Sequence, residues 1–128
     1  MRTQWTTEDL ATFGAAGEID IAPLGADGAP GHATTIWMVR VGDDLYIRSY
    51  RGAAGSWYRD AVRTHEVRIR AGNVERDVIV EECPDAERAA VDDAYRTKYG
   101  SSSYADAMVT SDAAATTLRV SPLHRKDP

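Results

Sequence analysis

Residues 34–61 read TTIWMVRVGDDLYIRSYRGAAGSWYRDA, and the polar break inside this stretch predicts a β-hairpin. Two alternating runs of β-branched, aromatic and other apolar residues lie on either side of Gly42-Asp43-Asp44. Such runs around a short polar turn are typical of paired antiparallel strands. A hairpin centred on Asp43 places four cross-strand neighbours on one apolar face: Val39, Val41, Leu45 and Ile47.

The opposite face of this predicted hairpin is larger and mixed in character. Its side chains are Ile36, Met38, Arg40, Tyr46, Arg48 and Tyr50. Soluble monomers rarely leave so much apolar and aromatic area in contact with water. We therefore expect this face to contact a ligand or a second copy of the chain, and we predict a homodimer.

The hairpin leads directly into a glycine-containing loop. Arg48 and Ser49 end the second strand, Arg51 and Gly52 open the loop, and Ser56 is expected to cap a helix. A helix N-terminus presents unpaired amides, and arginines add forked donors that match phosphate oxygens. These residues predict a phosphate site. They also fit a strand-to-helix corner held by caps and an acidic neighbour, and both interpretations stay in place here.

The charge distribution favours a small anion over a nucleic acid as the ligand. The formal net charge is −5, but residues 40–70 contain seven arginines against four acidic residues, a local charge of +3. The rest of the chain therefore carries −8. Because nucleic-acid binding needs a wide positive surface, we expect no nucleic-acid partner.

A second hairpin is predicted at residues 66–82, where Gly72-Asn73 separates two alternating runs. Pairing around this turn forms two cross-strand ion pairs, Arg68 with Asp77 and Arg70 with Glu75. Both arginines then have acidic partners, so we exclude them from the predicted phosphate site. The apolar face of this hairpin contains Val67, Ile69, Ala71, Val74 and Val78.

Shorter patterns predict the remaining elements. Helices are expected at residues 7–13 and 86–99, capped by Thr6 and Asp85, and strands at residues 18–24 and 114–121. Residues 101–111 are expected to form a loop with room for one helical turn. Five or six strands with three short helices predict an α+β fold built on a small antiparallel barrel. The chain has 128 residues, which is enough for one domain spanning residues 1–128.

Bulk features favour a cytoplasmic protein that does not contact membranes. Cys83 is the only cysteine, so an intramolecular disulfide is excluded, which fits a reducing compartment. The amino terminus does not resemble a signal peptide, and we find no apolar run of about 18 to 20 residues.

Other reactive side chains are weaker candidates for a site. His32, His65 and His124 are far apart and lack a partner at ligand spacing, so we expect no metal. The glutamates before Cys83 are expected to raise its thiol pKa, which argues against a nucleophile. Three phenols are candidate proton donors, although packing is the commoner role of such residues: Tyr46, Tyr50 and Tyr58.

Four segments carry a family resemblance: TTIWMVRVGDDLYIRSYRGAAGSWYRDAV, RIRAGNVERDV, AYRTKYG and TTLRV. Together they resemble a small bacterial family of unknown function related to the FMN-binding split barrels, a group that includes pyridoxamine-phosphate-oxidase-like proteins and deazaflavin-dependent nitroreductases. The resemblance implies a split β-barrel homodimer that holds FMN or a deazaflavin coenzyme between its subunits. Added to the glycine loop, it implies six cofactor-binding residues: Arg48, Ser49, Arg51, Gly52, Ser56 and Trp57.

Two departures from that group bear on the function. The nitroreductases carry a Lys-Ser-Gly loop where this chain reads GADGAPGHATT, and they carry Pro-x-Trp where it reads GSWYRDA. The leading hypothesis is a flavin- or deazaflavin-dependent oxidoreductase acting on a small organic molecule. The alternatives are a cofactor-free ligand-binding or biosynthetic protein that keeps the pocket, and a purely structural dimer.

Overall fold

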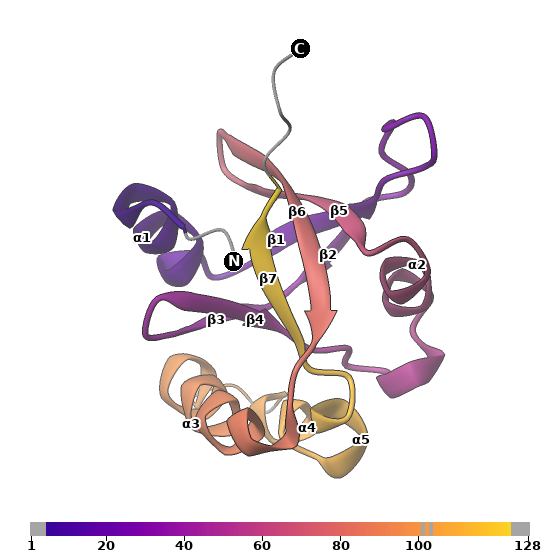
Figure 1. Ribbon diagram of the computed structural model, residues 1–128. Coiled ribbons are helices and arrows are strands. Elements are labelled where there is room, and N and C mark those ends of the chain that lie inside the picture. Colours follow the sequence, from indigo (N-terminus) through magenta and orange to yellow (C-terminus); the bar gives the residue numbers. More distant parts are fainter. Residues whose placement is uncertain (1–4, 101, 103, 124–128) are drawn as a thin grey trace.

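The computed structural model describes residues 5–100, 102 and 104–123, in which an antiparallel sheet curls into a nearly closed barrel (Figure 1). Its strands are β1 (Ile19–Pro23), β2 (Thr34–Ile36), β3 (Met38–Val41), β4 (Asp44–Ile47), β5 (Glu66–Ala71), β6 (Val74–Glu82) and β7 (Leu118–Pro122). They pair in the order β2-β1-β5-β6-β7-β4-β3. The described sheet has seven strands, more than predicted, because the run at residues 34–41 is interrupted at Trp37.

Short helices surround the barrel. They are α1 (Thr7–Ala15), α2 (Ser56–Thr64), α3 (Arg88–Tyr99), α4 (Ala105–Met108) and α5 (Ser111–Ala114), with 3-10 turns η1 (Gly52–Ala54) and η2 (Asp85–Glu87). In Figure 1, α1 and α2 lie on opposite sides of the barrel, and α3, α4 and α5 are grouped at one end. The predicted α+β fold with a small antiparallel barrel is therefore confirmed. Within the described residues, no helix combines the length and apolar character needed to cross a membrane.

The barrel opens where the two edges of the sheet meet. β2 and β3 are the edge strands, although they follow each other along the chain. Trp37 alone separates Ile36, which ends β2, from Met38, which begins β3. Because one residue cannot bridge the width of a flat sheet, the sheet has to curl until its edges approach each other.

The predicted register of the first hairpin is wrong by one residue. Val41 pairs with Asp44, so the turn contains only Gly42 and Asp43. Gly42 has a φ of 61°, which suits the first position of a two-residue hairpin turn. Such turns match the right-handed twist of the flanking strands, which favours this shorter connection over the one predicted.

The shift in register changes which side chains share a face, and both faces of this hairpin are largely covered. Met38 and Ile47 enter the barrel core, whereas Val39 and Tyr46 pack on the other side among residues of α3 and α4. The predicted open face of mixed side chains is therefore wrong, because Met38 and Tyr46 are buried. Of the aromatic residues predicted on that face, only Tyr50 is exposed.

The second hairpin has the predicted register. β5 and β6 pair around the Gly72-Asn73 turn, and Arg68 Nε donates to Asp77 Oδ1 at 2.7 Å, as predicted. Arg70 lies opposite Glu75, but its Nε donates to the Gly72 carbonyl at 3.0 Å instead. The strand pairing was therefore predictable from local sequence, and the second ion pair was not.

Helix boundaries follow the sequence signals only in part. The Thr6 hydroxyl accepts a hydrogen bond from the Asp9 amide at 3.1 Å, as predicted, and α1 then continues to Ala15. Asp85 does not cap α3, because it begins the 3-10 turn η2 and the α-helix starts at Arg88. α4 is the helical turn that the sequence allowed within the loop segment at residues 101–111, and α5 begins at the end of that segment.

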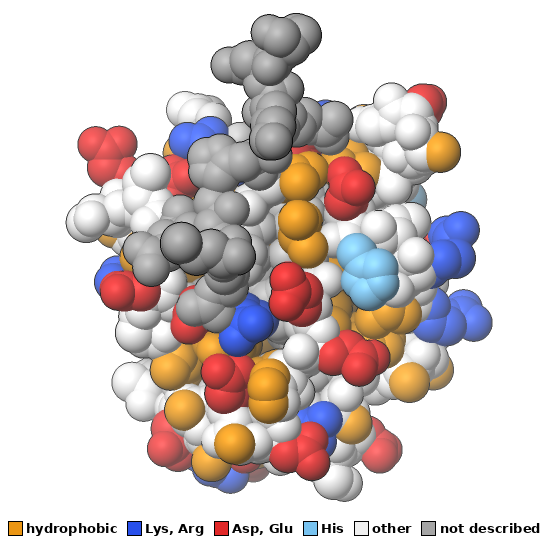
Figure 2. Space-filling model, in the orientation of Figure 1, with side chains coloured by type: hydrophobic (Ala, Val, Ile, Leu, Met, Phe, Trp, Pro, Cys, Tyr) orange, Lys and Arg blue, Asp and Glu red, His pale blue; other side chains and the backbone are white. Residues whose placement is uncertain are grey.

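Charged side chains are unevenly distributed over the surface. In the space-filling view, basic and acidic side chains are interspersed over the visible face, and basic side chains also gather at the edge where α2 runs (Figure 2). Arg59 and Arg63 are exposed residues of α2. Part of the basic middle segment of the sequence therefore lies exposed on α2.

Candidate functional site

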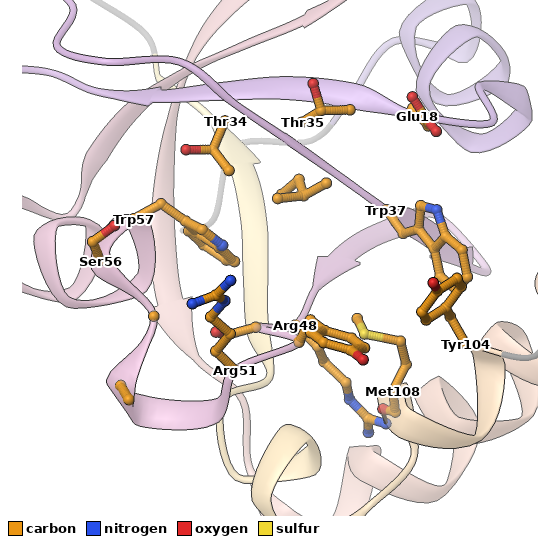
Figure 3. A pocket seen from close by; sticks show the side chains of 15 residues that line it. Glu18, Thr34, Thr35, Trp37, Arg48, Arg51, Ser56, Trp57, Tyr104 and Met108 are labelled. Carbon is orange, nitrogen blue, oxygen red and sulfur yellow. Dashed lines mark hydrogen bonds between the residues drawn. The ribbon is translucent and has the colours of Figure 1, made fainter.

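A cavity of about 730 Å³ lies at the opening of the barrel (Figure 3). Three chain segments form most of its wall: residues 34–37 at the β2–β3 corner, residues 48–51 after β4, and residues 54–57 at the start of α2. Glu18, Tyr104 and Met108 complete it. This volume is within the range of small-molecule binding sites.

Five of the six predicted cofactor-binding residues line this cavity: Arg48, Ser49, Arg51, Ser56 and Trp57. Gly52 is not part of the wall. It is buried, its φ is 62°, and its amide donates to the Ser49 carbonyl at 3.0 Å. Gly52 therefore shapes the turn that brings the other residues together, and the phosphate contacts themselves stay a prediction.

The Arg48 guanidinium is engaged inside the protein. The side chain is only 1% exposed and leaves the cavity toward the helices (Figure 3). Its Nε donates to Thr117 Oγ1 at 2.9 Å, and its Nη atoms donate to Asp92 at 2.5 Å and to the carbonyls of Met108 and Arg88 at 2.9 and 3.1 Å. Four of its five N–H donors thus tie the residue after β4 to the residue before β7 and to α3 and α4.

The Ser49 hydroxyl differs from the Arg48 guanidinium in its hydrogen bonding. Ser49 is 1% exposed, and its amide donates to Thr116 Oγ1 at 2.9 Å. Its Oγ, however, has no hydrogen-bond partner among the described residues. A Cβ at position 55 would lie 2.5 Å from this oxygen, so only glycine lets the Ser49 hydroxyl lie against the start of α2.

Helix α2 begins beside that hydroxyl without a side-chain cap. Gly55 is the N-cap residue, so the prediction that Ser56 caps the helix is wrong: Ser56 is the first helical residue. Within the described chain, no side chain caps this end, and the first turn contains no acidic residue. Its amides and the positive end of the helix dipole therefore remain available to an anion.

Arg51 supplies a cation without a partner. Among the described arginines, only Arg51 and Arg59 have neither an ion pair nor a hydrogen bond from their side chains. Arg51 is exposed and extends into the cavity on the side of Trp57 (Figure 3). The end of the cavity near α2 therefore combines a free guanidinium with free hydroxyl and amide donors.

The other end of the cavity is aromatic. Tyr50 and Tyr104 are 55% and 60% exposed, and they are the large hydrophobic residues that the described chain leaves exposed. Their rings meet edge to face with centroids 6.0 Å apart. Trp37 forms the neighbouring part of the wall. The cavity thus has one polar, cationic end and one aromatic end.

The remaining reactive candidates lie elsewhere. Burial raises the pKa of Tyr46 to about 12 and also raises that of Tyr58, and neither residue lines the cavity. Burial, with a hydrogen bond to Glu87, raises the pKa of Cys83 to about 12. The predicted direction is confirmed, but its cause is burial and Glu87 and not the glutamates before Cys83. Tyr50 is therefore the one predicted proton donor that lines the cavity.

A metal site is likewise not apparent in the part of the chain that the structure describes, where no group of His, Cys, Asp and Glu is arranged to hold an ion. His124, one of the three histidines considered above, lies outside the described residues.

Comparison with known families identifies the chain. A family model described as an uncharacterized protein conserved in bacteria, DUF2255, matches residues 9–120. The chain belongs to this family. The predicted resemblance to a bacterial family of unknown function is therefore confirmed. No curated protein sequence matches this DUF2255 chain significantly.

Solved structures show what the DUF2255 fold is similar to. HutZ, a heme storage protein from Vibrio cholerae, has a TM-score of 0.66 at 14% identity, over 98% of this chain and 93% of that one. An F420-H2 dependent reductase, FDR-A, has a TM-score of 0.63 at 17% identity, over 81% of this chain and 93% of that one. A putative pyridoxamine 5′-phosphate oxidase from Listeria innocua has a TM-score of 0.58 at 13% identity, over 91% of this chain and 90% of that one. At these identities the likeness establishes a shared split-barrel fold.

Sequence reasoning missed part of the DUF2255 cavity. The sequence around Trp37 contained a hint of a binding residue, since Trp37 is a large aromatic residue inside a β-rich run. The interruption of the strand at this position was not predicted. No sequence pattern marked Met108 and Tyr104 as cavity residues, because α4 approaches the barrel only through tertiary packing.

Proposed function

We propose that this DUF2255 protein binds a phosphate-bearing flavin-type cofactor, FMN or a deazaflavin coenzyme, in the cavity and acts as an oxidoreductase on a small organic molecule. One observation carries the proposal. Within the described part of the chain, the Ser49 hydroxyl is buried without a partner beside the uncapped start of α2, and Arg51, also unpaired there, extends into the same cavity.

The energetics of Ser49 favour an anionic ligand. A buried hydroxyl without a hydrogen bond costs about 1 to 3 kcal/mol, and folded proteins rarely keep such a group without a reason. A phosphate oxygen would accept a hydrogen bond from Ser49 and from the first amides of α2. Arg51 would add a charge-assisted bond, and Arg48 would hold the end of β4 in position from behind.

The shape of the cavity fits the same class of ligand. Its cationic end suits a phosphate and its aromatic end suits a planar ring, with an apolar lining between them. When bound, the cofactor supplies hydride transfer. The residues of this chain would orient it and exclude water, and the Tyr50 phenol is a candidate proton donor at the rim.

The charges beside the cavity favour a single phosphate. A neighbouring groove shares Thr34, Ser56 and Trp57 with the cavity and runs between α2 and the loop after β1. Its charged residues are Asp27, Asp60, Glu66, Arg63 and His32. Because acidic residues outnumber the single arginine, which pairs with Asp60, a second phosphate in this groove would be repelled.

The names of the structural neighbours support a redox cofactor. They include an F420-H2 dependent reductase, a putative pyridoxamine 5′-phosphate oxidase and an FAD-binding protein from Mesorhizobium loti. These proteins share the fold of this chain and little of its sequence, so the cofactor is carried over as part of the proposal.

We also propose that the protein works as a cytoplasmic homodimer. The exposed Tyr50–Tyr104 pair stands at the rim of the cavity, and a second copy packed there would remove both rings from water. Light scattering at micromolar concentration tests this, and a monomer would contradict it.

Titration with FMN and with a deazaflavin coenzyme, followed by visible absorption, tests the proposed cofactor. Arg51→Ala should weaken binding by about 10- to 150-fold and reduce its dependence on salt, because a charge-assisted bond contributes about 1.5 to 3 kcal/mol. Arg68→Ala is the matched control, since Arg68 pairs with Asp77 away from the cavity. If the wild type binds neither cofactor, the oxidoreductase proposal fails and the cofactor-free ligand-binding alternative replaces it.

A further inference from the structure

We propose that Trp37 is the surface on which the planar ring of the ligand stacks, and that the last turn of α3 holds it rigid for this purpose. The inference rests on the proposed function and adds to it the residue that recognises the ring. It assigns the site to ligands in which an aromatic ring system is joined to a phosphate.

Trp37 already stacks on one side. Its ring lies 3.9 Å from the ring of Tyr99, with an angle of 2° between the planes. Trp37 is only partly buried, and it also forms part of the cavity wall (Figure 3). An indole that is covered on one face and borders a cavity is suited to stack with a second planar ring.

Two side chains of α3 fix this arrangement. The Tyr99 hydroxyl donates to the Gly17 carbonyl at 2.9 Å and lies 3.3 Å from the Met38 carbonyl. Lys98 Nζ donates to the same Met38 carbonyl at 2.6 Å and lies 5.2 Å from the Tyr99 ring. Met38 directly follows Trp37, so these bonds hold the backbone of the corner that carries the indole.

The corner needs this support because of its place in the barrel. Trp37 is the single residue between the two edge strands, outside both β2 and β3. Position 37 therefore lacks the ladder bonds that would order it as part of a strand. A platform fixed before the ligand arrives lowers the entropy lost on binding.

The phosphate end and the ring end come from different parts of the chain. Arg51 and Ser49 follow β4, whereas Trp37 lies at the β2–β3 corner, and Figure 3 shows Arg51 and Trp37 on opposite sides of the cavity. The two ends can therefore be tested separately with ligands that carry only one of the two groups.

The experiment uses three probes: riboflavin, which has the ring without phosphate, inorganic phosphate, and FMN. Calorimetric titration compares the wild type with Trp37→Leu and Arg51→Ala. Trp37→Leu should weaken riboflavin and FMN by about 10-fold and leave inorganic phosphate unchanged. Arg51→Ala should weaken FMN and inorganic phosphate and leave riboflavin unchanged.

Two further variants keep the test decisive. Trp37→Phe keeps a smaller ring and should weaken riboflavin less than Trp37→Leu does, which decides the matter if the leucine variant does not fold. Tyr99→Phe keeps the stacked ring but removes the hydroxyl that holds Gly17, so it should weaken riboflavin by about 2- to 5-fold. Circular dichroism confirms that each variant is folded.

The outcomes separate the two proposals. If the wild type binds inorganic phosphate and FMN but Trp37→Leu binds riboflavin and FMN as the wild type does, the stacking role of Trp37 is overturned and the proposed function stands. Equal losses of riboflavin and inorganic phosphate in Trp37→Leu also overturn it, since they indicate general distortion. If the wild type binds none of FMN, the deazaflavin coenzyme and inorganic phosphate, the proposed function itself fails.

Discussion

Replacing Arg48 with methionine tests whether this arginine holds the cavity in shape. Methionine keeps an unbranched apolar stem and removes the guanidinium. The change leaves Asp92 without its cation and removes donors from Thr117 and from two backbone carbonyls, those of Met108 and Arg88. Asp92, Arg88 and Met108 belong to α3 and α4, and Thr117 directly precedes β7, so the loss affects the junction of the barrel with its helices.

The expected cost follows from the burial of the pair. Removing one partner of a buried ion pair costs about 3 to 5 kcal/mol. Asp92 remains partly exposed, which places Arg48→Met at the lower end of that range, at about 3 to 4 kcal/mol. At about 4 °C per kcal/mol for a chain of this size, the melting temperature should fall by roughly 12 to 16 °C.

Urea unfolding followed by circular dichroism measures this cost. Arg68→Met is the matched control, because the partly exposed Arg68–Asp77 pair should contribute only about 0 to 1 kcal/mol. A loss below about 1 kcal/mol for Arg48→Met would refute the structural role. Arg48→Lys should stay folded at low temperature. If it then loses FMN affinity as severely as Arg51→Ala, Arg48 contacts the phosphate directly, as the sequence predicts.

Gly55→Ala should block phosphate binding and lower the free energy of unfolding by about 1 to 2 kcal/mol, because the new Cβ would lie 2.5 Å from Ser49 Oγ. Gly17→Ala is the control in a thermal melt, because a Cβ at position 17 would meet nothing within 4 Å. Burial lowers the pKa of Lys98 from 10.5 to about 8, so between these values the unfolded chain binds more protons than the folded one. The free energy of unfolding should therefore gain about 1 to 2 kcal/mol from Lys98 as the pH rises from 8 to 10.5. Lys98→Met should lack this gain in urea titrations at each pH, and an unchanged pH profile would contradict the argument.

Local sequence was sufficient for the second hairpin. The Gly72-Asn73 turn and the alternation of residues 66–71 favour one register, and the structure has it. The start of α1 is equally local, because the hydrogen bond from the Asp9 amide to Thr6 spans only three residues. Such features depend on neighbours in the chain, so the pattern of residue types contains the information needed to predict them.

The first hairpin shows where this information ends. Both of its faces carry large apolar or aromatic residues, so alternation could not tell which register puts the correct residues inside the barrel. α3 decides the matter by covering Val39 and Tyr46, and it begins more than 40 residues after them. The interruption at Trp37 has the same origin, because it is needed only when the two sheet edges meet.

The proposed phosphate site was likewise predictable from local sequence only in part. The sequence alone placed Arg48, Ser49 and Arg51 beside the start of a helix, and all three line one cavity. It could not tell the two arginines apart, since both flank the same serine. Tertiary structure makes the difference: α3 and the residue before β7 bring Asp92 and Thr117 to Arg48 from 44 and 69 residues away. Among the described residues none comes to Arg51. Free donors at a site are those that long-range packing leaves without partners, and no local pattern determines which these are.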